Sequence, residues 1–265
     1  MPARALAALL LMSGPALAAE TVRLHAAGSL RAALTDVSAA FERASGNAIE
    51  ATYGPSGVLK DEISGGAKAA VFASANMEHP AALAKAGRSS PVVLFARNRL
   101  CALARPGLAV TTATLLDVML DPAVKLATST PKADPSGDYA FEMFRRAEAI
   151  EAGARATLEA KALQLTGAPS SAPAPRGRSV YGWHVAEGRA DVFITYCTNA
   201  LAAQKENAGQ QIVALPETLA VGADYGLTVM NDAPASAYRL ALFILSREGQ
   251  SLLASHGFAA PALPQ

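Results

Sequence analysis

The sequence has almost no net charge, because 23 basic residues are balanced by 22 acidic ones, for a formal net charge of +1. Nothing in this balance favours a nucleic acid or an anionic membrane surface as a partner. Beyond its N-terminus the chain also lacks any run of about 18 consecutive apolar residues, the length that a membrane-spanning helix needs. A ligand must therefore be recognised by a few local groups.

The sequence is also poor in cysteine and histidine, with two and four residues respectively. Cys101 and Cys197 both lie in apolar stretches typical of strands, so the pattern fits two buried thiols as well as one disulfide. No pair of these residues has the spacing of a metal or redox motif, and no motif ties a histidine to a serine. The sequence therefore predicts neither a bound metal ion nor an enzyme.

Residues 1–19 have the pattern of a secretory signal peptide. Arg4 supplies a positive charge, an apolar stretch continues to Met12, and the small residues Ala16 to Ala18 form a cleavage site. Glu20 stands where a lipoprotein would carry cysteine. We therefore expect the mature chain to be a soluble periplasmic protein without a lipid anchor.

Short strand patterns alternate with helical patterns along the whole mature chain. In the first unit, Val22, Leu24 and Ala26 alternate as in a strand, and a helical pattern runs from Leu30 to Gly46. This alternation predicts an α/β fold with mostly parallel sheets flanked by helices. Other expected elements are strands over 92–96 and 100–104, an interrupted helix over 139–164, a loop over 167–177 and two C-terminal helices split at Gly249.

Serine stands at four places where an extended stretch turns directly into a helix pattern. The first backbone N–H groups of a helix have no intrahelical partner, so each place offers donors to an anion in addition to the capping hydroxyl. Each helix start carries about half a positive charge, so several together would balance a dianion without lysine or arginine. The candidates are Ser29, Ser56, Ser136 and Ser179 with its neighbour Val180, and Tyr196 adds a phenol at the carboxyl end of a strand.

The order of these motifs resembles the periplasmic molybdate-binding proteins of ABC importers. The resemblance covers almost the whole mature chain and rests on the segments 26–30, 54–59, 66–75, 135–139 and 190–196, and on closing helices over 238–258. It implies a two-lobed periplasmic-binding-protein fold of type II, with a ligand cleft between the lobes. The implied lobes are residues 20–97 with 198–265, and residues 98–197.

The resemblance also implies a ligand and the residues that bind it. The ligand would be molybdate or tungstate, bound without a cofactor by a monomer that hands it to a membrane permease. Asp138 departs from this scheme, because a carboxylate near a dianion repels it unless the side chain points away. The implied binding residues are Ser29 and Ser56 through hydroxyl and amide, Ser136 and Ser179 or Val180 through amides, and Tyr196 through its phenol.

Three other interpretations stay open on the sequence. Sulfate, phosphate or a small organic acid would fit the same scaffold. A serine hydrolase is a second alternative, although Gly54 to Gly57 does not form the G-x-S-x-G turn of such enzymes. A ferric ion is the third, because periplasmic iron binders use clustered tyrosines with histidine or carboxylates. The residues available for iron would be Tyr139, Tyr181, Tyr196, His184 and Asp138.

Overall fold

The computed structural model describes residues 20–261, so the segment 1–19 expected to be a signal peptide lies outside the described residues. No helix within residues 20–261 combines the length and the apolar character needed to cross a membrane. The helices and strands are, in chain order, β1 (Thr21–Ala27), η1 (Gly28–Leu30), α1 (Arg31–Ser45), β2 (Ala48–Gly54), α2 (Ser56–Ser64), β3 (Val71–Ser74), α3 (Glu78–Lys85), β4 (Val93–Ala104), α4 (Leu115–Leu120), β5 (Leu126–Ser129), α5 (Pro135–Ala147), α6 (Ala154–Lys161), β6 (Leu163–Thr166), α7 (Val180–Ala186), β7 (Val192–Tyr196), α8 (Cys197–Glu206), β8 (Gln211–Ala214), η2 (Glu217–Leu219), β9 (Gly222–Val229), α9 (Ala235–Leu245) and α10 (Arg247–Ser255).

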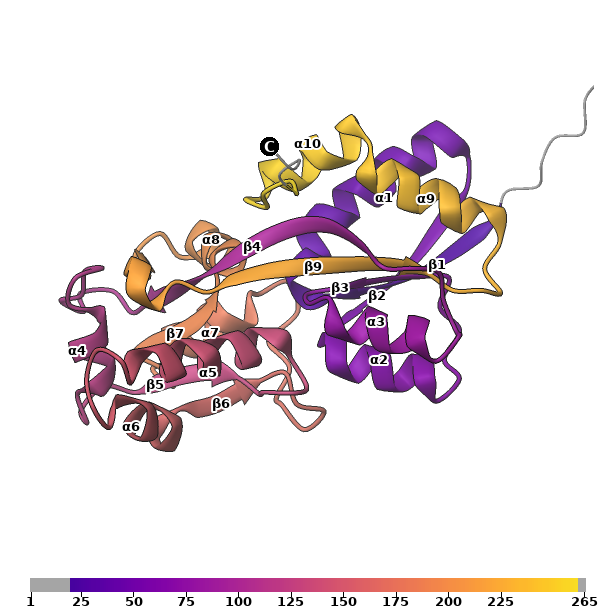
Figure 1. Ribbon diagram of the computed structural model, residues 1–265. Coiled ribbons are helices and arrows are strands. Elements are labelled where there is room, and N and C mark those ends of the chain that lie inside the picture. The colour runs from indigo at the N-terminus through magenta and orange to yellow at the C-terminus, as the bar shows by residue number, and fades with distance from the viewer. Residues whose placement is uncertain (1–19, 262–265) are drawn as a thin grey trace, which may run out of the picture.

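The first lobe is built on a sheet with the strand order β2-β1-β3-β9-β4. β1 pairs in parallel with β2 and β3, and β3 is buried along its whole length. Helices α1, α9 and α10 cover one face of this sheet, and α2 and α3 cover the other (Figure 1). α1 forms as the apolar spacing predicts, with Leu34, Val37 and Phe41 buried on one side, and ends at Gly46 in a left-handed conformation.

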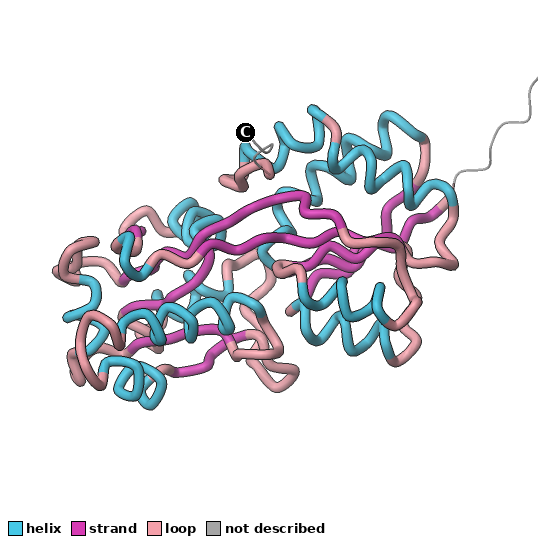
Figure 2. Tube along the Cα trace, in the orientation of Figure 1, coloured by secondary structure: helices cyan, strands magenta, loops and turns pink. Residues whose placement is uncertain are grey.

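The second lobe has its own sheet, with the order β8-β4-β7-β5-β6. β5 pairs in parallel with β6 and β7, whereas β4 runs antiparallel to β7 and β8. α5 packs on one face, with α6 and α4 beside it, and α7 and α8 pack on the other. Figure 2 shows the strands as an inner layer with helices outside them in both lobes. The predicted two-lobed α/β fold is confirmed.

Two long strands, β4 and β9, connect the lobes (Figure 1). β4 pairs with β9 from Val93 to Arg99, with β7 from Leu100 to Ala104 and with β8 from Cys101 to Ala104, so it changes partners within one strand. The sequence predicts two separate strands here. They are one strand because Asn98 and its two arginine neighbours keep the pairing with β9, and the Arg97 Nε lies 2.9 Å from Asp224 Oδ1.

The pairing of α8 and β8 bears on where the chain returns to the first lobe. α8 and β8 were expected to belong to the first lobe, whose second segment was set at residues 198–265. In the structure β8 pairs with Cys101 to Ala104, and α8 packs on β4, β7 and β8. We therefore propose that the second lobe extends to Leu219 and that the return crossing is the start of β9 at Gly222.

The C-terminal helices divide at Ser246 rather than at Gly249. The Ser246 hydroxyl accepts a hydrogen bond from the Gly249 amide, so the serine caps α10 and the glycine lies inside its first turn. A side chain at Gly249 would overlap the Phe243 carbonyl oxygen. The glycine is therefore needed for close packing of the two helices rather than for ending one of them.

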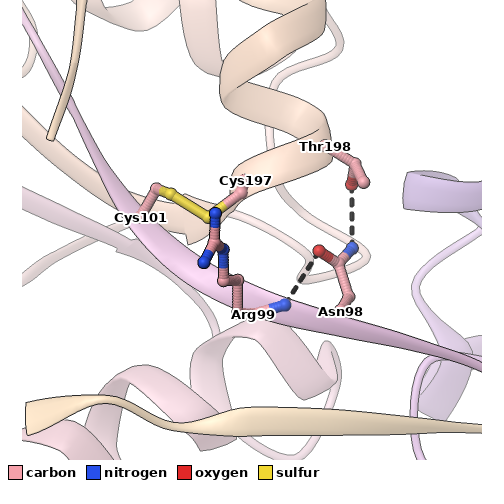
Figure 3. The surroundings of a disulfide bond; sticks show 5 residues. All are labelled: Asn98, Arg99, Cys101, Cys197 and Thr198. Carbon is pink, nitrogen blue, oxygen red and sulfur yellow. Dashed lines mark hydrogen bonds between the residues drawn. A yellow bond between two sulfur atoms is a disulfide. The ribbon is translucent and has the colours of Figure 1, made fainter. Parts of the chain in front are cut away.

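A disulfide joins Cys101 on β4 to Cys197, the first residue of α8 (Figure 3). The two Cα atoms lie 4.9 Å apart, and the residues are separated by 96 positions in the sequence. Nearby, the Asn98 side-chain amide donates a hydrogen bond to Thr198 Oγ1 at 2.8 Å. Both links attach the start of α8 to β4, directly after Tyr196 at the end of β7.

Reduction of this disulfide should lower the free energy of unfolding by about 3 to 5 kcal/mol, because the bond closes a long loop and so restricts the unfolded chain. Chemical denaturation with and without reductant measures the effect. The double variant Cys101→Ser/Cys197→Ser is the control, and its unfolding curve should not respond to reductant. Equal stability of the oxidised and reduced wild type would contradict the prediction.

Candidate functional site

A cavity of about 340 Å³ lies between the lobes, at the carboxyl ends of strands from both sheets. Its lining includes Ala27, Gly54, Thr166 and Tyr196, the last residues of β1, β2, β6 and β7, together with Ala75 just after β3. Strand carboxyl ends are where α/β sheets place their ligands. The cavity therefore has the position of a ligand site and is bounded by both lobes.

Ser29 and Ser56 line the first-lobe wall of this cavity. Ser56 begins α2 and is only 1% exposed, and its Oγ accepts a hydrogen bond from the Ala75 amide at 3.0 Å. The hydroxyl proton of Ser56 is then available to another acceptor. Ser29 Oγ lies 3.0 Å from Tyr225 Oη, which in turn accepts a hydrogen bond from the Asn98 side chain at 3.2 Å. Either hydroxyl can be the donor in the Ser29–Tyr225 pair, and when Tyr225 donates, the Ser29 proton is free for a ligand.

Tyr196 and Val180 line the second-lobe wall. The Tyr196 phenol is 1% exposed and donates a 3.4 Å hydrogen bond to the Ala75 carbonyl across the lobes. Burial raises the pKa of Tyr196 well above its ordinary value, and Tyr225 nearby adds to the effect. The phenol therefore stays protonated and can act only as a neutral donor or acceptor. Val180 is the first residue of α7, whose start faces the cavity.

Ser136 and Ser179 do not line the cavity, although the sequence groups them with the other candidates. The Ser136 amide donates to Asp134 Oδ1 at 3.0 Å, and the Ser179 amide donates to Glu206 Oε1 at 2.7 Å. The Ser179 hydroxyl caps α7 by accepting a hydrogen bond from Gly182. Both amides therefore already have carboxylate partners. Of this region, Val180 and Tyr181, the two residues after Ser179, line the cavity.

Asp134 is a lining residue that sequence reasoning missed. It is the N-cap of α5 and is followed by Pro135, a combination that marks helix starts and was visible in the sequence. Burial raises the pKa of Asp134 to about 6, partly offset by hydrogen bonds from Ser136 and Ser129, while the charge of Asp138 adds to the rise. Asp134 is therefore a carboxylate that titrates close to neutral pH inside the cavity.

Asp138, the carboxylate that the sequence singles out, lies elsewhere. Its Oδ1 accepts a 2.7 Å hydrogen bond from the Lys132 amide, and it is not a lining residue of the cavity. Gly167 packs closely against the Asp134 side chain, and its lack of a side chain leaves space for that residue. A side chain at Gly167, which has a φ of +90°, would lie 2.6 Å from the Asp134 Cβ.

Arg31 and Tyr53 also line the first-lobe wall and were not predicted. The Arg31 guanidinium stacks over the Tyr53 ring at 4.7 Å from its centroid, and donates a 3.4 Å hydrogen bond to the Tyr53 carbonyl. A cation in the first turn of a helix opposes the helix dipole, so Arg31 at the start of α1 is an unfavourable placement for the helix itself. It places a positive charge at the edge of the cavity.

The metal hypothesis is not supported by a cluster of the usual ligands. Within residues 20–261, no group of three or more histidine, cysteine, aspartate or glutamate side chains is placed to hold a metal ion. His184 is buried against Phe193 with a ring separation of 6.2 Å, and it is not a lining residue of the cavity. Tyr181 and Tyr196 do line the cavity, and burial raises the pKa of both phenols in the absence of a cation.

The family profile described as "Bacterial extracellular solute-binding protein" matches residues 22–259. The chain belongs to this family. Family membership assigns it to extracellular solute binding. A curated relative from Pasteurella multocida, the uncharacterized protein PM1146, is 33% identical over 239 residues, which make up 89% of this chain and 98% of the relative.

Solved structures of the same fold bind different solutes. The sulfate-binding protein SubI from Mycobacterium tuberculosis superposes with a TM-score of 0.74 at 18% identity, over 91% of this chain and 87% of that one. The periplasmic molybdate-binding protein of Azotobacter vinelandii superposes with a TM-score of 0.71 at 17% identity, over 91% and 100%. At such identities the likeness establishes the fold, and the solute depends on the chemistry of this chain's own cavity.

Beside the cavity, one backbone hydrogen bond connects the lobes. The Gly57 amide on α2 donates to the Ala133 carbonyl at 3.0 Å. A Cβ on Gly57 would overlap the Lys132 carbonyl oxygen and lie 2.8 Å from that of Ala133. Glycine therefore permits the close approach of α2 to the 132–133 backbone of the other lobe.

The variant Gly57→Ala should hold the lobes apart, because the new methyl group overlaps two carbonyl oxygens of the second lobe. Small-angle X-ray scattering should report a larger radius of gyration, while the free energy of unfolding changes by less than about 1 kcal/mol, since alanine is a better helix former. Gly65→Ala, at the end of the same helix, meets only ordinary contacts at 3.4 Å and serves as the control. Identical scattering curves for Gly57→Ala and wild type would contradict this assignment.

Proposed function

We propose that this protein captures a small oxyanion outside the cytoplasm, with molybdate or tungstate as the leading candidates, and delivers it to an ABC permease. The observation that carries the proposal is that Ser29, Ser56 and Tyr196 bring three hydroxyl groups from two lobes to one cavity. Ser56 can donate to a ligand oxygen, Ser29 can do so when Tyr225 is the donor in their mutual hydrogen bond, and Tyr196 can do so when a ligand replaces the Ala75 carbonyl as its acceptor. Arg31 adds a positive charge at the edge, where it attracts anions without filling the cavity.

Backbone groups support the same chemistry. The starts of α2 and α7 reach the cavity through Ser56 and Val180, and the first N–H groups of each helix lack intrahelical partners. Such amides and the helix dipole favour negative charge. The resemblance to molybdate-binding proteins and the A. vinelandii structure favour molybdate among the oxyanions, and SubI keeps sulfate as the competing ligand.

A small organic anion is a second candidate, because the cavity volume favours it. The volume of about 340 Å³ lies at the lower end of the range of sites for organic ligands, which begins near 300 Å³. The loop after β6 forms part of the lining with small residues, among them Ala168, Ser171 and Ala172, and leaves this space open. Titration with citrate and with glycerol 3-phosphate tests this candidate directly.

Capture would occur by closure of the lobes about β4 and β9. The two strands are the connections between the sheets, so a change in their twist moves one lobe relative to the other. The contacts from Gly57 to Ala133 and from Tyr196 to Ala75 are then closed-state contacts between the lobes. The permease would recognise this closed form.

Isothermal titration of the mature protein should give tight binding of molybdate and tungstate and weaker binding of sulfate and phosphate. A bound anion should also raise the melting temperature, because only the folded state binds it. Ferric citrate should not raise the melting temperature beyond the effect of citrate alone. Tighter binding of sulfate, or no heat with any of the four oxyanions, would overturn the molybdate assignment.

The variant Ser56→Ala should weaken binding of the preferred oxyanion by about 1.5 to 3 kcal/mol, because one hydrogen bond to a charged ligand is lost. Ser38→Ala is the matched control. Ser38 is a buried serine of α1 whose hydroxyl has no partner among the described residues, and it does not line the cavity. Titration calorimetry measures both, and equal affinities of Ser56→Ala and wild type would remove Ser56 from the site.

A further inference from the structure

Asp134 is a negative group in a cavity whose other polar groups suit an anion. It lines the same cavity as Ser56, Tyr196 and Arg31, and it forms no ion pair within residues 20–261. Only its Oδ1 has a backbone donor, the Ser136 amide at 3.0 Å. A carboxylate and a fully ionised oxyanion both accept hydrogen bonds and neither donates, so they repel each other in a shared, partly dry space.

The groups around Asp134 do not relieve this repulsion. Asp138 on the same helix is a second acid, and its charge opposes ionisation of Asp134. Three tyrosines lie on three other elements, and the charge of Asp134 in turn raises the pKa of each of them. Arg31 lies at the edge, stacked on Tyr53. The titratable and charged groups concerned are thus Lys132 before α5, Asp138 on α5, Tyr181 on α7, Tyr196 on β7, Tyr225 on β9, and Arg31 on α1.

We propose that the site binds its oxyanion together with one proton, shared between the Asp134 carboxyl group and the nearest ligand oxygen. The inference rests on the proposed function, because it concerns the same cavity and requires an anionic ligand. A fully ionised anion such as molybdate takes this proton from solvent through Asp134, which then donates a hydrogen bond to it. An anion such as hydrogen phosphate brings the proton, and ionised Asp134 accepts it in a hydrogen bond.

The position of Asp134 makes it a specificity-determining residue. Around pH 6 it exists in both forms, so the cavity admits both kinds of anion. At higher pH the carboxylate form dominates, and the site then favours an oxyanion that retains a hydroxyl group over one that has none. Release into a more alkaline compartment would be favoured for a fully ionised anion, because loss of the proton from Asp134 restores the repulsion.

Calorimetric titration with molybdate and with phosphate from pH 6 to pH 8.5 tests the proposal on the wild type and on Asp134→Asn. Asparagine is as good an N-cap as aspartate, so α5 should keep its start. For the wild type, molybdate affinity should fall about tenfold per pH unit above pH 7, with uptake of about one proton in buffers of different ionisation enthalpy. Asp134→Asn should bind molybdate with an affinity independent of pH, and more tightly than the wild type at pH 8.

Phosphate should respond in the opposite way. Its affinity for the wild type should persist at pH 8, and Asp134→Asn should weaken it at least tenfold, because the amide cannot fully replace the charged acceptor. Asp138→Asn is the matched control. It removes a neighbouring carboxylate but keeps an oxygen for the Lys132 amide, so the pH dependence of molybdate binding should remain.

Two results would overturn the inference while leaving oxyanion capture intact. One is molybdate affinity of the wild type that does not change with pH and shows no proton uptake. The other is Asp134→Asn with the same pH dependence as the wild type. Absence of binding of both anions to either chain would instead contradict oxyanion capture itself, and the inference with it.

Discussion

The antiparallel pairing of β4 with β9 is the interaction on which the two-lobed structure depends. β4 pairs with β9 in the first sheet as far as Arg99 and with β7 and β8 in the second sheet from Leu100 onward, so the hydrogen bonds of both sheets meet in one strand. Parallel strands on both sides end near this crossing, which brings their carboxyl ends to one cavity. The lobes are joined through the extended backbone of β4 and β9, the segments about which we propose that the site opens and closes. The disulfide from Cys101 to Cys197 then attaches the end of β7, with Tyr196, to the same strand.

The cavity combines several hydroxyl groups, which can donate hydrogen bonds, with one carboxyl group, which accepts them when ionised. Ser56 accepts a hydrogen bond from the Ala75 amide and so keeps its proton for a ligand, and Ser29 does the same when Tyr225 donates to it. Burial keeps the Tyr196 phenol protonated. Asp134 is the exception, because it caps α5 with a carboxylate at the position where a helix start would otherwise offer amides to an anion. The aspartate that caps α5 therefore also affects which anions the cavity can bind.

Some features of the structure can be predicted from local sequence patterns, and others depend on residues that are distant in the sequence. The apolar spacing of α1 and its glycine stop are local, and the structure confirms them. The polar residues around Asn98 suggest a break between two strands, yet β9, far away in the sequence, pairs with them and keeps one strand. Ser136 and Ser179 look like Ser29 and Ser56 in sequence, but their amides are occupied by Asp134 and by Glu206. Glu206 reaches Ser179 through a tertiary contact, and Asp134 reaches Ser136 through a side-chain conformation that the sequence pattern does not specify.

The sequence by itself determined the class of fold, the helix starts that carry hydroxyl groups, and three of the serine and tyrosine residues that line the cavity, because these follow from periodicity and capping within short stretches. Only the tertiary structure decided which helix starts face a common space, that the two cysteines are bonded, and that the acid in the cavity is Asp134 rather than Asp138. The physical reason is the same in each case. A side chain's partners across the lobes depend on how β4 and β9 bring distant segments together, and that arrangement is a property of the whole chain.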